Sequence, residues 1–141
     1  MQSLTTSITR SFHWGIALVM DRDADIPDLD PERPVTAGDS ALIVTVRHGA
    51  DIPSSQSAPA EVSIVVRRHE RPVELAGRRQ LFDGVLATPT GRLSIGDAIE
   101  DVELSTHAGR TRVTVSVDAE WPVDDHHHES LVIDLAPAER S

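Results

Sequence analysis

An alternating hairpin near the C-terminus, residues 101–118 (DVELSTHAGRTRVTVSVD), constrains the fold of this chain more than any other segment. Val113, Val115 and Val117 are separated by polar residues, and Gly109 precedes them in a turn. A period of two places successive side chains on opposite faces of a β-strand. Two such runs around a glycine-bearing turn predict a β-hairpin. This part of the chain is therefore expected to be antiparallel β-structure.

Similar alternation recurs along most of the sequence. Residues 7–20 predict one strand whose even positions face a core, with Gly15 as a bulge or bend. Further strands are predicted at residues 40–47, 61–68, within 79–88, 92–95 and 130–135. No convincing helix is found, and 141 residues are enough to bury a core without disulfides or metals. We expect a single domain over residues 1–141, an all-β, antiparallel two-sheet β-sandwich of seven or eight strands.

The composition excludes several kinds of enzyme chemistry. All 13 basic residues are arginine, and the chain has no lysine or cysteine. Schiff-base and P-loop lysines, thiol nucleophiles, iron–sulfur clusters and zinc ribbons are therefore excluded. Nucleophile-elbow, zincin and dinucleotide-binding motifs are also missing from the sequence. We expect a protein that is not an enzyme and needs no cofactor.

The net charge of −10 bears on the choice of partner. Nucleic-acid binding relies on Lys and Arg at phosphates, so an acidic domain disfavours it. A basic protein would instead be attracted over long range, although the charge can also serve solubility alone. No secretory signal is visible at the N-terminus, and the longest uninterrupted apolar run of the chain, residues 16–20, is too short to span a membrane. A cytoplasmic location without membrane association is expected.

A tryptophan among acids follows the hairpin, in residues 118–129 (DAEWPVDDHHHE). An exposed Trp surrounded by charge is typical of an interaction hot spot. Alternatively, the Trp closes one end of the sandwich. The predicted partner-binding residues are Asp118, Glu120, Trp121, Asp124, Asp125 and Glu129.

The histidines of the same segment suggest a second hypothesis. If residues 124–129 are extended, His126 and His128 project to one side together with Asp124. Imidazole and carboxylate groups at this spacing suit a divalent metal. The alternative is a solvated turn whose histidines titrate near neutral pH.

Basic residues are also clustered in one region of this acidic chain. Such a cluster can hold an acidic group or balance acidic loops of the same chain. It lacks interleaved aromatic residues for base stacking, which argues against nucleic acid. We expect solvated strand ends with intramolecular pairing. The cluster consists of Arg67, Arg68, His69, Arg71, Arg78 and Arg79.

The order of features in residues 91–138 resembles the competence protein J family, small acidic inhibitors of the DNA-entry nuclease. A short strand opens at Gly91, an alternating hairpin turns at Gly109, and a long strand ends near Trp121. An acidic, His-bearing loop and a closing strand with an Ile133-Asp134 pair follow. The resemblance covers about a third of the chain. It implies a β-sandwich whose rigid acidic loop occupies a basic nuclease cleft.

Three functional hypotheses therefore stand. The first is a non-enzymatic binding module of the inhibitor or immunity type, with a basic partner such as a nuclease or toxin. The second is a metal-binding β domain that uses the loop of residues 124–129. The third is a structural protein that forms homo-oligomers through its sheet edges.

Overall fold

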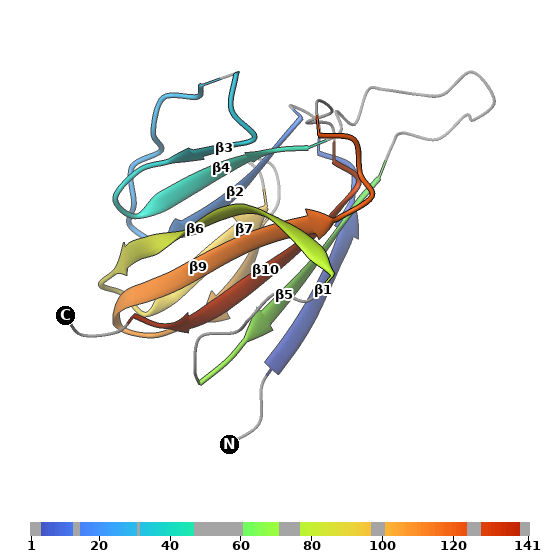
Figure 1. Ribbon diagram of the computed structural model, residues 1–141. Coiled ribbons are helices and arrows are strands. Elements are labelled where there is room, and N and C mark those ends of the chain that lie inside the picture. Colours follow the sequence, from blue (N-terminus) through green and yellow to red (C-terminus); the bar gives the residue numbers. More distant parts are fainter. Residues whose placement is uncertain are drawn as a thin grey trace.

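The computed structural model describes residues 4–12, 15–30, 32–46, 61–70, 77–96, 101–123 and 128–138. These residues form ten strands (Figure 1). The strands are β1 (Leu4–Arg10), β2 (Ile16–Asp21), β3 (Val35–Ala37), β4 (Ala41–Thr45), β5 (Val62–Arg68), β6 (Arg78–Thr88), β7 (Arg92–Gly96), β8 (Asp101–Ser105), β9 (Gly109–Asp118) and β10 (Ser130–Pro137). Among the described residues, no helix is long and apolar enough to cross a membrane.

The strands form two five-stranded sheets, which confirms the all-β, two-sheet fold. The first sheet has the order β1-β5-β10-β9-β6, and the second has the order β3-β4-β2-β7-β8. Neighbouring strands are antiparallel with one exception, the parallel pair β5 and β10. A parallel pair requires a long crossover connection, and here β6 to β9 supply it. The two sheets are antiparallel as expected apart from this pair, with ten strands instead of seven or eight. The hairpin expected over residues 101–118 is wrong, because β8 and β9 lie in different sheets.

The strand expected over residues 7–20 is in fact two strands in different sheets. Gly15 has a φ of 69°, and its amide donates to the carbonyl of Phe12 at 3.1 Å. This left-handed turn, which glycine adopts at little cost, carries the chain from β1 to β2. Ile8 faces the core from β1, but Val19 rather than Met20 does so from β2. The predicted even-numbered core face therefore holds before Gly15 and fails after it.

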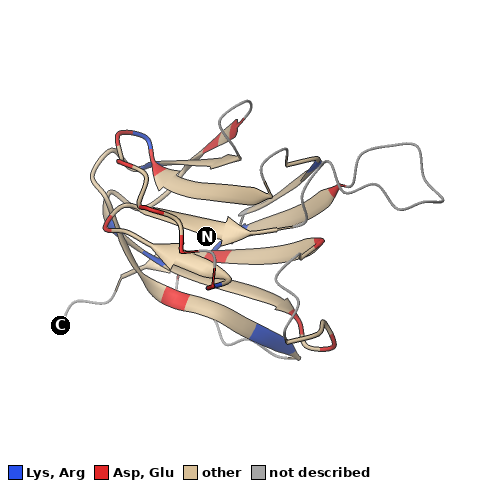
Figure 2. Ribbon diagram, turned by 90° about the horizontal axis from the view of Figure 1, so that it is seen from above, with Lys and Arg blue, Asp and Glu red and all other residues tan. Residues whose placement is uncertain are grey.

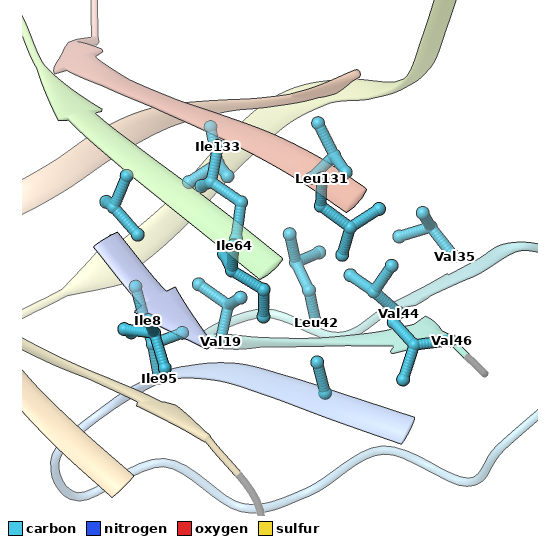
Figure 3. Close-up of a cluster of buried hydrophobic side chains, with 14 of the residues drawn as sticks. Ile8, Val19, Val35, Leu42, Val44, Val46, Ile64, Ile95, Leu131 and Ile133 are labelled. Atoms are coloured by element: carbon cyan, nitrogen blue, oxygen red, sulfur yellow. The ribbon is translucent and has the colours of Figure 1, made fainter. Parts of the chain in front are cut away.

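The core lies between the two sheets and is mainly aliphatic. Figure 3 shows Ile64, Leu131 and Ile133 of the first sheet above side chains of the second sheet. Leu42 and Val44 are among these opposing residues, and all five are fully buried. Burial of a side chain of this size stabilises the fold by about 1.5–3 kcal/mol. The two layers are thus held together by their alternating inner faces.

Candidate functional site

An ordered turn follows β9 and presents two of the predicted partner-binding acids. The carboxylate of Asp118 accepts a hydrogen bond from the amide of Glu120 at 2.9 Å. The carbonyl of Asp118 accepts one from the amide of Trp121 at 3.0 Å. These bonds fix the backbone as Asx-type turns do. Asp118 and Glu120 are both exposed, so their charges face solvent from a defined position.

Trp121 is half-buried and packs against His128. Its ring centroid lies 5.7 Å from that of His128, with an angle of 47° between the planes. Its carbonyl accepts a hydrogen bond from Nη1 of Arg79 at 2.6 Å. The ring contact with the buried His128 supports a packing role for Trp121, and part of the residue remains accessible to solvent.

The other predicted residues of this segment fall into two groups. His128 is 1% exposed, and its backbone forms a parallel bridge with Val46. Glu129 is half-buried, and its carbonyl accepts the amide of Ser63 at 2.9 Å. Asp124, Asp125 and His126 lie outside the described residues. Over the ranges that the structure describes, no group of three or more His, Asp or Glu residues is arranged to hold a metal ion.

A second acidic loop connects β2 to β3 and is anchored by a buried carboxylate. Asp21 is 1% exposed and accepts a hydrogen bond from the hydroxyl of Thr90 at 2.8 Å. Beyond this anchor, Asp23 and Asp25 are exposed. Ile26 is also exposed, at 54% of its surface.

The basic cluster is largely paired within the protein. Arg67 donates from Nε and Nη2 to both carboxylate oxygens of Asp134, at 2.8 and 3.1 Å. Nε2 of His69 lies 2.7 Å from Oδ1 of Asp134. Two further arginines, Arg78 and Arg79, donate to Ser116 and to the Trp121 carbonyl. The expected intramolecular pairing is confirmed for these four residues, and Arg71 lies outside the described ones.

Asp134 was not predicted as the partner of this cluster. It lies in β10, is 4% exposed, and is separated from Arg67 by 67 residues of sequence. A lone carboxylate inside the apolar run LVIDLA was the available signal. Nearby on the same sheet, the hydrogen bond from Arg112 is the main cause that lowers the pKa of Asp83 below 3.8.

His107 is a second titratable group, among the described residues, whose pKa is shifted. Burial is the main cause that lowers its pKa below 6.5, and the nearby charge of Arg68 adds to the effect. The imidazole is therefore neutral at neutral pH. Its Nε2 is buried and has no hydrogen-bond partner among the described residues.

The fold is similar over its full length to two solved structures. One is ComJ from Bacillus subtilis, the inhibitor of the DNA-degrading activity of NucA, with a TM-score of 0.65 and 15% identity over 97% of this chain and 98% of that chain. The other is crocagin biosynthetic gene J, with a TM-score of 0.58 and 14% identity over 99% and 100%. No family model matches the sequence, and no curated protein does so. The resemblance expected from residues 91–138 is thus confirmed for the fold of the whole chain.

Proposed function

We propose that this chain is a non-enzymatic inhibitor that acts by binding a basic protein, in the first instance a nuclease. The observation that carries the proposal is the structural similarity to ComJ over 97% of the chain. ComJ is an inhibitor of the DNA-degrading activity of NucA. The net charge of −10 supports a basic partner, because opposite charges accelerate encounter.

The turn after β9 is the part of the surface best suited to this role. A nuclease cleft binds phosphates and therefore presents Lys and Arg. Asp118 and Glu120 place two exposed carboxylates on a turn with fixed hydrogen bonds. Asp124 and Asp125 would extend this charge, and Trp121 would supply an apolar anchor beside it. A rigid acidic turn loses little entropy on binding, which favours affinity.

The proposal is tested by adding the purified protein to NucA and to nucleases encoded in the same genome as this chain. DNA degradation is followed, and complex formation is measured by calorimetry. We expect stoichiometric inhibition of one such nuclease, without binding to the DNA itself. If none of these nucleases is inhibited or bound, the proposed inhibitor function is wrong.

A pair of variants locates the binding surface. Asp118→Arg with Glu120→Arg should weaken inhibition at least about tenfold, since each lost close charge pair at an interface is worth about 1.5 kcal/mol or more. Asp23→Arg with Asp25→Arg makes the same change of charge on the loop between β2 and β3 and should weaken inhibition far less. Equal losses from both pairs would remove the turn as the specific contact.

A further inference from the structure

A cavity of about 220 Å³ opens where the edges of the two sheets face each other. Its apolar walls are Val66 of β5, Leu135 of β10 and Leu104 of β8. Thr6 lines it from β1, and β1 and β8 are edge strands of their respective sheets. The sandwich is therefore open to a small molecule along this side, with access to its inner surface.

One charged side chain reaches this cavity from the inner face of the first sheet. Val62, Ile64 and Val66 point inward from alternate positions of β5, and Arg68 occupies the next inward position. Arg68 is half-buried and lines the cavity beside the apolar walls. An arginine at the end of an apolar inner face is unusual, because removing a guanidinium from water is costly without a partner.

The acid nearest to this cavity is already engaged elsewhere. Glu103 lines the rim, but its carboxylate pairs with Arg92 at 2.7 Å. No carboxylate in the described part of the chain lies within 4.0 Å of the Arg68 guanidinium. The adjacent Arg67 faces the opposite way and is held by both oxygens of Asp134. Arg68 thus keeps its planar set of donors, which matches a carboxylate.

The volume limits what can enter. A ligand pocket for a drug-sized molecule measures about 300–1,000 Å³, and an apolar cavity of about 150 Å³ accepts benzene. A space of about 220 Å³ lies between these limits. It suits an acid with one ring or a short chain, of the size of benzoate or hexanoate.

We propose that this cavity binds a small apolar carboxylic acid. The carboxylate lies against the Arg68 guanidinium, and the hydrocarbon part packs between Val66, Leu104 and Leu135. The site faces the space between the sheets, whereas the turn at Asp118 lies at the end of β9. The proposal is therefore independent of the inhibitor function.

Hexanoate, hexanol and hexylammonium share a six-carbon chain and differ in the charge of the head group. Their relative affinities therefore test whether the site selects a carboxylate. Calorimetry and methyl chemical shifts of Val66, Leu104 and Leu135 should detect hexanoate, with hexanol at least about tenfold weaker and hexylammonium weaker still. A charged bidentate contact of about 1.5–3 kcal/mol gives this ratio. Hexanol binding as tightly as hexanoate, or no hexanoate binding at all, would overturn the proposal.

Two variants and one control test the assigned residues. Arg68→Gln should weaken hexanoate at least about tenfold, whereas Arg22→Gln removes the same charge from an exposed loop residue and should leave the affinity unchanged. Leu104→Phe should fill the cavity and abolish hexanoate binding. This variant still tests the proposal if Arg68→Gln does not fold. Full affinity in either folded cavity variant contradicts the assignment.

Discussion

At the scale of single residues, Asp134 shows how one carboxylate organises a sheet face. It accepts two hydrogen bonds from Arg67 and lies 2.7 Å from the His69 ring. Asp134 is nearly completely buried, whereas the pair between Asp83 and Arg112 is more accessible. A buried carboxylate that loses its charge leaves its donors poorly satisfied, while an exposed pair is replaced by water.

Asp134→Asn is therefore expected to lower the free energy of unfolding by about 1–3 kcal/mol. Asp83→Asn, on the same sheet, should lower it by less than about 1 kcal/mol. Urea unfolding of both variants, followed by fluorescence and circular dichroism, provides the comparison. Equal losses would show that the burial of Asp134 adds nothing to its ionic contacts.

At the scale of elements, the change of sheet at Gly15 determines which face of β2 is buried. Val19 is fully buried between the sheets, whereas Met20 is half-buried on the other face. Val19→Ala should thus destabilise the protein by about 2 kcal/mol, and Met20→Ala by less than about 1 kcal/mol. Thermal and urea unfolding would measure both. A larger loss from Met20→Ala, which removes the larger side chain, would contradict the observed register.

The sequence predicted most strands because alternation is a local property. The strands β5, β7, β8, β9 and β10 lie where they were expected, within a few residues. The predicted hairpin of β8 and β9 is wrong, because β8 pairs with β7 in one sheet and β9 with β10 and β6 in the other. Alternation identifies two faces of a strand but not the sheet to which it belongs. The split at Gly15, the short β3 and the parallel pairing of β5 with β10 therefore escaped prediction.

The candidate surfaces also differ in how far the sequence alone could predict them. The composition around Trp121 indicated the exposed acids Asp118 and Glu120, because such a signal is local. By contrast, Arg67 and Arg68 are adjacent in sequence but face opposite sides of the sheet. Arg67 donates to Asp134, whereas Arg68 lines the cavity between the sheets. The surroundings of these two side chains depend on how strands distant in the sequence pair with each other.

At the scale of the whole molecule, negative charge is distributed over several loops and strand ends (Figure 2). Exposed acids lie in the connection from β2 to β3, on β8 and after β9; examples are Asp23, Asp25, Asp28, Asp101, Glu103, Asp118 and Glu120. Like charges at this net value repel each other in the compact state. A basic partner that binds the acidic surface would reduce this repulsion, so binding and folding stability are linked.

The free energy of unfolding at pH 7 should therefore rise with salt, because screening weakens repulsion more than the short ion pairs. An increase in NaCl from about 0.01 M to about 0.1 M shortens the screening length from about 30 Å to about 10 Å. We expect a gain of about 1 kcal/mol in the free energy of unfolding, the scale of one close pair of like charges in water.

Near pH 5.0, where the net charge approaches zero, this gain with salt should disappear. The Asp83 pair persists there, because its pKa is lowered below 3.8 and the stability it contributes is lost only at more acidic pH. Urea titrations at both pH values measure the effect. A loss of stability with salt at pH 7 would mean that attractive pairs outweigh the net charge.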